Sequence, residues 1–131
     1  MKLFPLGLAC VLGACTPAEK PNQDLAVSLV WSSYVAYHHV EPVPPVILWT
    51  DGPFDLAQLQ GNPIHAAGAY WANGPIACWW EGSFAQSKSF AHELYHAFMW
   101  LAFQHLDYQH TDPEWNSLVP DTQELLGEAG L

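Results

Sequence analysis

The chain has 131 residues, a length that suits one domain with a single modest core. Thirteen acidic residues, three lysines and no arginine give a formal net charge of −10. Nucleic acid is therefore not an expected partner, because binding to phosphates relies on lysine and arginine.

The first fourteen residues have the features of a targeting segment. Lys2 forms a short positive region, residues 3–12 are apolar but too few to span a bilayer, and small residues follow. The stretch Leu12-Gly13-Ala14-Cys15 resembles the lipobox of bacterial lipoproteins. This resemblance implies cleavage before Cys15, attachment of lipid to Cys15, and a location in the bacterial cell envelope, anchored to the membrane. The alternative is an ordinary secretory signal with an incidental cysteine.

A signal peptide at residues 1–14, a polar tether at residues 15–24 and one folded domain at residues 25–131 make up the expected organisation. Cys15 is assigned to the lipid and Cys10 is lost with the signal peptide, so no intrachain disulfide is expected. Cys78 is then either a core residue, which we favour, or a thiol that acts on a metal.

Hydrophobic periodicity predicts a first helix at residues 22–38, with Asn22 or Asp24 as its N-cap. A proline-rich stretch follows and excludes further helix. The apolar run at residues 46–49 predicts a buried strand, and residues 54–59 are expected to be a short helix or irregular.

Two apolar stretches at residues 69–71 and 76–80 flank the sequence Ala72-Asn73-Gly74-Pro75. Asn-Gly between two such stretches is typical of a β-hairpin turn. Towards the end of the chain, a last short helix is predicted to begin at Asp121 or Thr122 and to end at Glu128.

Between the hairpin and that last helix, residues 90–103 predict a helix, with Ser87 or Ser89 as the N-cap. The segment has hardly any polar residues and is therefore expected to be buried almost all round. Its exceptions are His92, Glu93 and His96. Unpaired polar groups are costly in a core, so their presence needs an explanation.

These residues match the pattern His-Glu-x-x-His, which binds zinc in metalloproteases. Residues four apart share one face of a helix, so His92 and His96 can offer two nitrogens to one tetrahedral zinc ion. Glu93 is then the expected general base for a water molecule that the zinc activates. The alternative is a buried helix whose histidines are satisfied without a metal.

A catalytic zinc needs three protein ligands and one open position. His110 is the preferred third ligand because it follows the helix after a short turn, and Asp112 is expected to accept a hydrogen bond from a ligand imidazole. The alternatives for the third ligand are His105, Glu114, Glu124 and Glu128.

A group that polarises the substrate carbonyl is also expected in such a site. Three residues are candidates for that role, and the sequence does not choose among them: Tyr95, His105 and Tyr108.

The pattern of hairpin, HExxH helix and downstream histidine over residues 69–115 resembles the zincin metallopeptidases. The resemblance implies an α+β, minimal zincin-like domain, in which a small, mostly antiparallel sheet packs on an N-terminal helix and the central HExxH helix. It implies hydrolysis of peptide or protein substrates, with Zn²⁺ on His92 and His96 and with Glu93 as base. It also implies that extended substrate pairs with an edge strand, which we assign to residues 76–80.

Two alternatives to an active peptidase remain. One is a catalytically inactive zincin-like lipoprotein that binds zinc or a partner. The other is a structural envelope lipoprotein in which the motif is accidental.

Overall fold

The structure, a computed structural model, describes residues 19–50, 52, 54–55, 65–66 and 68–131. The predicted signal peptide, the lipobox with Cys15 and the first part of the tether lie outside the described residues. Most of the segment 54–59 also lies outside them. Its first two residues form a strand, β2 (Phe54–Asp55), rather than a helix or irregular chain, and β2 pairs antiparallel with β3 (His65–Ala66).

The described chain forms a small α+β fold, as predicted. Its helices are α2 (Gln23–His38), α4 (Phe90–Phe103) and α5 (Leu118–Glu128), with a short 3-10 helix, η1 (Pro113–Asn116), before α5. Its larger sheet contains β1 (Ile47–Thr50), β4 (Gly68–Tyr70) and β5 (Ile76–Trp79). Among the described residues, no helix combines the length and apolar character needed to cross a bilayer.

The larger sheet is mixed rather than mostly antiparallel, and its strand order is β1-β5-β4. β4 and β5 form the predicted antiparallel hairpin, with Gly68 opposite Cys78. β1 runs parallel to β5 on its other side, with Ile47 opposite Ile76. The assignment of residues 76–80 to an edge strand is therefore wrong, because β1 pairs with the outer side of β5. The edge strand of the hairpin is β4, and β1 forms the opposite edge of the sheet.

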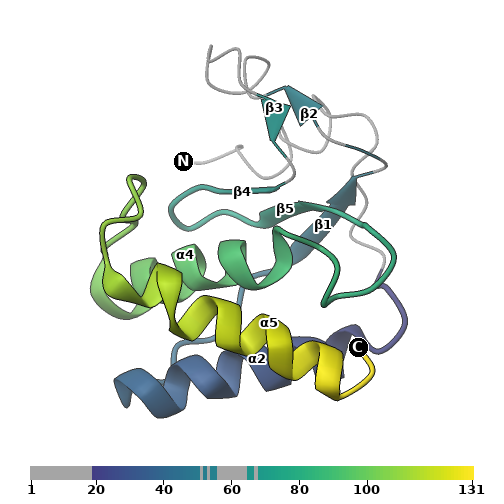
Figure 1. Ribbon diagram of the computed structural model, residues 1–131. Helices are drawn as coiled ribbons and strands as arrows, with labels where there is room; N and C mark the ends of the chain where they lie inside the picture. The colour runs from purple at the N-terminus through teal and green to yellow at the C-terminus, as the bar shows by residue number, and fades with distance from the viewer. Residues whose placement is uncertain (1–18, 51, 53, 56–64, 67) are drawn as a thin grey trace.

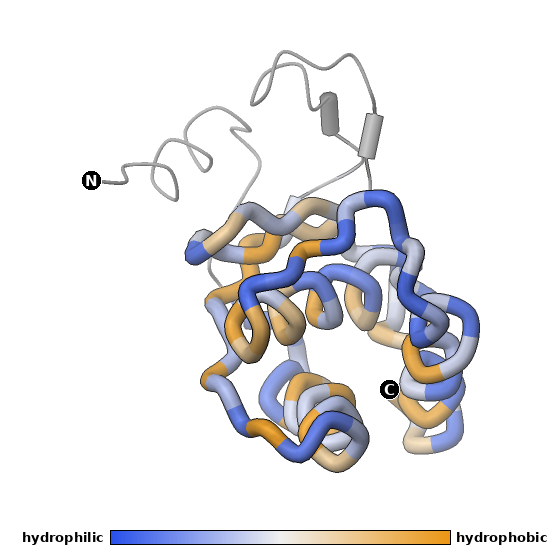
Figure 2. Tube along the Cα trace, turned by 90° about the vertical axis from the view of Figure 1, so that its left-hand side faces the viewer, coloured by the Kyte–Doolittle hydropathy of each residue, from blue (hydrophilic) through white to orange (hydrophobic). Residues whose placement is uncertain are grey.

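Helix α4 lies between the sheet on one side and α2 with α5 on the other (Figure 1). Figure 2 shows the same layers in a view turned by 90°. This central position explains why α4 is buried almost all round, as its sequence predicted. A buried hydrogen bond from the Tyr34 hydroxyl to the carbonyl of Ala91, 2.8 Å long, ties α2 to α4.

The ends of the helices differ in detail from the predicted ones. α4 begins directly after Ser89, as expected, but the Ser89 side chain makes no capping hydrogen bond. Asn22 precedes α2 with a left-handed φ of 64°, and its side chain does not cap the helix either. α5 begins at Leu118, earlier than the predicted start at Asp121 or Thr122. Pro120 is compatible with this start because it falls in the first turn, where no backbone N–H is needed.

Candidate metal centre

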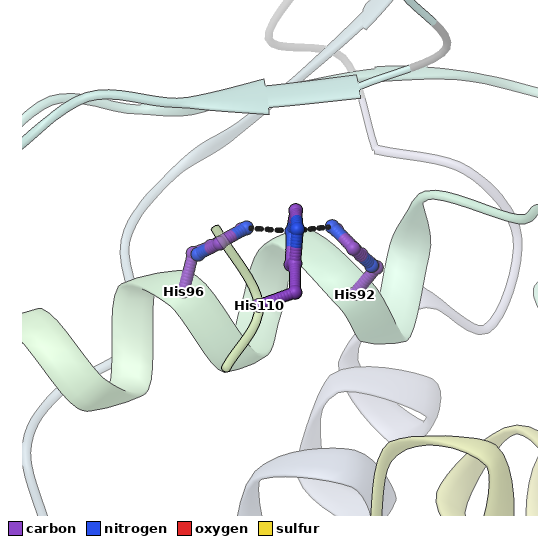
Figure 3. A group of neighbouring side chains, drawn as sticks. All are labelled: His92, His96 and His110. Atoms are coloured by element: carbon purple, nitrogen blue, oxygen red, sulfur yellow. Dashed lines mark hydrogen bonds between the residues drawn. The ribbon is translucent and has the colours of Figure 1, made fainter. Parts of the chain in front are cut away.

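Three imidazoles converge on one point beneath the sheet (Figure 3). His92 and His96 project from α4 one turn apart, and His110 approaches from the loop between α4 and η1. The Nε2 atom of His110 lies 3.0 Å from Nε2 of His92 and 3.0 Å from Nε2 of His96. The structure thus brings together the three histidines that the sequence selected as ligands.

The arrangement fits a tetrahedral cation. Zn–N distances of roughly 2.0–2.1 Å place the nitrogens of a tetrahedral site about 3.3 Å apart, which is close to the observed separations. The Nδ1–H of His96 donates to the carbonyl of Leu106 at 2.7 Å, so the lone pair on its Nε2 faces the other two rings. An N–H on Nε2 of His110 can donate a hydrogen bond to Nε2 of His92 or to Nε2 of His96, but not to both. A shared cation would satisfy all three nitrogens.

The surroundings keep the two helix histidines neutral, the form that binds metals. Burial, together with the neighbouring His96 and His110, lowers the pKa of His92 to about 4. Burial also lowers the pKa of His96 to about 4. Protons therefore do not compete for these two nitrogens near pH 7.

Glu93 lies beside the three imidazoles. Its side chain is buried, and Oε2 lies 3.9 Å from Nε2 of His92. Burial raises the pKa of Glu93 to about 8, so the carboxyl group holds a proton at neutral pH when no cation is near. A divalent cation on the imidazoles would favour its charged form.

A pocket of about 240 Å³ opens directly onto the site. The edge strand β4 forms one wall, and the helix with the His110 loop forms the other. The lining residues are Gly68, Ala69, Tyr70, His92, Glu93, His96, Tyr108 and His110. The residues that carry the three imidazoles and the carboxyl group therefore border one pocket.

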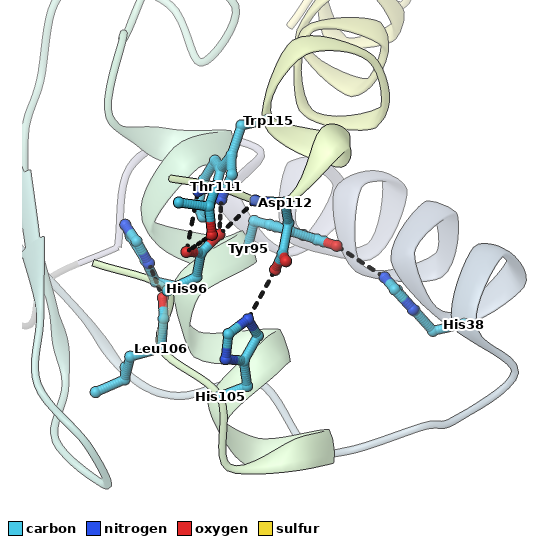
Figure 4. Close-up of polar contacts among 9 residues, drawn as sticks. His38, Tyr95, His96, His105, Leu106, Thr111, Asp112 and Trp115 are labelled. Carbon is cyan, nitrogen blue, oxygen red and sulfur yellow. Dashed lines mark hydrogen bonds and ion pairs between the residues drawn. The ribbon is translucent and has the colours of Figure 1, made fainter. Parts of the chain in front are cut away.

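The other candidates for a third ligand lie away from the three imidazoles. His105 is exposed, and its Nε2 lies 2.9 Å from Oδ2 of Asp112 (Figure 4). The expectation that Asp112 holds a ligand imidazole is therefore wrong, because Asp112 pairs with His105 and the Leu106 carbonyl holds His96. Glu114 accepts a hydrogen bond from Tyr37 at 2.9 Å. The exposed residues Glu124 and Glu128 on α5 do not line the pocket.

Of the three candidates for polarising a carbonyl, Tyr108 is the one that lines the pocket. The hydroxyl of Tyr95 lies 2.8 Å from Nε2 of His38 and is directed at α2 rather than at the pocket (Figure 4). Burial raises the pKa of Tyr108, and the charge of Glu93 raises it further. The hydroxyl of Tyr108 therefore stays a hydrogen-bond donor at neutral pH.

The sequence did not identify Asp107 and Trp115 as site residues. Asp107 accepts hydrogen bonds from the backbone and hydroxyl of Thr111, from the backbone of Asp112 and from the indole of Trp115, at 2.8–3.0 Å. Burial alone would raise the pKa of Asp107, but these hydrogen bonds outweigh it and hold the pKa well below its usual range. The only signal in the sequence is that aspartate often accepts hydrogen bonds from backbone N–H groups a few residues on.

Cys78 lies fully buried on β5, and burial raises the pKa of its thiol. The charge of Glu93 raises that pKa further. Cys78 is not among the residues whose ligand atoms converge with the three imidazoles. Its position is that of a core residue.

Comparisons with protein-family models, with curated proteins and with solved structures gave no match. The function therefore has to be inferred from the chemistry of the site.

Proposed function

We propose that this chain is a zinc-dependent metallopeptidase of the zincin type. One observation carries the proposal. The Nε2 atoms of His92 and His96 each lie 3.0 Å from Nε2 of His110. Glu93 lines the same pocket as these three histidines.

The donor set supports zinc over other ions. Three neutral imidazoles suit zinc and related transition metals, whereas magnesium and calcium prefer oxygen ligands. When bound, zinc lowers the pKa of a water molecule towards about 7 and polarises a carbonyl group.

The residues of the chain then divide the remaining work of peptide hydrolysis. Glu93, in its charged form, accepts a proton from the attacking water and passes it to the leaving amine as the C–N bond breaks. Tyr108 donates a hydrogen bond to the carbonyl oxygen, on which negative charge develops. β4, rather than β5, offers its backbone to an extended substrate, because β4 borders the pocket.

Sequence features of the N-terminal segment support a location in the bacterial cell envelope. In this proposal, lipid on Cys15 anchors the protein to the membrane, and the substrates are peptides or proteins. The alternative of an inactive zinc-binding lipoprotein shares the metal site and differs only in turnover.

Metal analysis combined with peptide cleavage tests the proposal. We expect the wild-type protein to bind one zinc ion, and His92→Ala and His110→Ala to lose it. His105→Ala, which changes an exposed histidine outside the site, should retain it. Glu93→Gln should retain zinc and lose cleavage of a peptide library. Wild-type protein without bound zinc would refute the proposal, and zinc binding without any cleavage would favour the inactive alternative.

A further inference from the structure

The indole of Trp115 contacts all three imidazoles of the candidate metal centre. Its ring centroid lies 4.7 Å from that of His92, 4.5 Å from that of His96 and 4.6 Å from that of His110. Trp115 comes from η1, outside the HExxH helix, and is 9% exposed. One buried side chain therefore touches every proposed ligand.

The indole contacts the imidazoles from outside the pocket. Trp115 is not among the residues that line the pocket. Tyr95 packs edge-on against it, with ring centroids 5.0 Å apart. The hydroxyl of Tyr95 in turn contacts His38 on α2. The three rings are thus supported by a packed aromatic layer, while their Nε2 atoms remain accessible from the pocket.

Asp107 holds both the indole and the loop that carries His110. Its Oδ2 accepts hydrogen bonds from the Trp115 indole and from the backbone of Asp112, each 2.8 Å long. Its Oδ1 accepts two from Thr111, the residue after His110. Asp107 and His110 have left-handed φ values of 50° and 56°, which residues other than glycine disfavour. The hydrogen bonds to Asp107 therefore stabilise the loop in this conformation.

We propose that Trp115, held by Asp107, is a positioning residue that preorganises the three imidazoles for metal binding. The proposal rests on the metal site of the proposed function. Its physical basis is that a ring packed on all three ligands limits their rotation before the ion arrives, so less ordering remains to be done on binding. Hydrogen-bonding partners of metal ligands typically change metal affinity by about 10–100-fold, and we expect an effect of that order from the packing of Trp115.

Titration of the metal-free full-length protein with Co²⁺ tests this inference, because the visible absorption of cobalt reports the geometry of its ligands. We expect Trp115→Leu to bind Co²⁺ about 10–100-fold more weakly than wild type and with an altered spectrum. Trp115→Phe, which keeps a ring, should recover much of the affinity and the wild-type spectrum. Asp107→Asn keeps the Trp115 side chain but removes one of the two carboxylate oxygens that hold the indole and the His110 loop, so it should weaken binding as well.

Trp100→Phe is the matched control, because the Trp100 indole bonds to Asn73 rather than to Asp107. It should leave both affinity and spectrum unchanged. Wild-type affinity and spectrum in folded Trp115→Leu would overturn the inference while leaving the metal site intact. If Trp115→Leu does not fold, a wild-type affinity in Asp107→Asn would overturn it instead. Failure of the wild-type protein to bind Co²⁺ would refute the proposed function itself.

Discussion

Gly68 on β4 lies directly against Glu93 on α4. A Cβ atom at position 68 would lie 2.9 Å from Cγ of Glu93 and 2.5 Å from Cβ of Ser89. The edge strand and the HExxH helix therefore pack closely beside Ser89 and the proposed base, and the absence of a side chain at Gly68 permits that approach.

Gly68→Ala is expected to destabilise the protein, because the new methyl group must push β4 away from α4. Forcing an extra carbon into a packed contact typically costs about 1–3 kcal/mol. Guanidinium unfolding of the metal-free protein measures the change. Gly127→Ala on α5 is the control, since its Cβ would meet Ala85 at an ordinary 3.7 Å and alanine favours helix. A Gly68→Ala protein as stable as wild type would contradict the close packing of strand and helix.

The stability of the metal-free protein should depend on the ionisation of Glu93. Burial raises the pKa of Glu93 from 4.5 to about 8, so the folded state favours the protonated form. The contribution of Glu93 to the free energy of unfolding is fully present below about pH 4.5. It is lost as the pH rises towards 8, and the free energy of unfolding then falls by up to about 1.4 kcal/mol per pH unit. Glu93→Gln removes this dependence. In urea unfolding with a chelator, the variant should therefore gain stability relative to wild type between pH 5 and pH 8. A pH-independent difference between the two proteins would argue against a buried carboxyl group.

Zinc should stabilise the folded protein through His110. A ligand that binds only the folded state at 100 times its dissociation constant adds about 2.7 kcal/mol to the free energy of unfolding. Thermal unfolding with and without zinc measures this gain. We expect His110→Ala to lose the gain and His105→Ala to keep it, because His105 contacts Asp112 instead of the other imidazoles. An equal gain in both variants would assign the third ligand elsewhere.

Tyr108→Phe should reduce kcat for peptide cleavage without releasing zinc. Tyr108 lines the pocket, and removing a hydrogen-bond donor to a developing oxyanion typically costs about 10²–10³-fold in kcat. Tyr37→Phe, which removes an exposed hydroxyl bonded to Glu114, is the control and should cleave at the wild-type rate. Unchanged kcat in Tyr108→Phe would remove Tyr108 from the mechanism.

Cys15→Ala should release the protein from the membrane fraction. Attachment of several acyl chains to one residue gives stable anchoring, whereas a single chain is marginal. Metabolic labelling with a fatty-acid analogue, followed by fractionation, tests the expectation. A labelled or membrane-bound Cys15→Ala protein would exclude Cys15 as the anchor.

Predictions based on helical periodicity agree with the structure. The bounds of α4, its burial and the neighbouring positions of His92 and His96 all follow from spacing within one helix. Such spacing is set by hydrogen bonds between residues four apart, so it requires no knowledge of distant partners. The β4–β5 hairpin is local in the same sense, although its hydrogen-bonded turn runs from Trp71 to Gly74 with Ala72 and Asn73 at its centre.

Predictions that depended on distant partners were less successful. β5 has the composition of a strand, but its central position depends on β1, which pairs with it across a long stretch of sequence. Asp112 stands near the ligands in the sequence, yet the loop directs it to His105. The contacts of Trp115 with the imidazoles arise only once the chain after α4 has folded back onto that helix.

The amino-acid sequence by itself determined a buried helix that presents two imidazoles and a carboxyl group along one turn. Only the tertiary structure decided that His110 joins them, that β4 borders the pocket, and that Asp107 and Trp115 support the rings. The reason is physical. Helix geometry repeats every few residues, whereas loop closure and strand pairing depend on contacts between residues far apart in the chain.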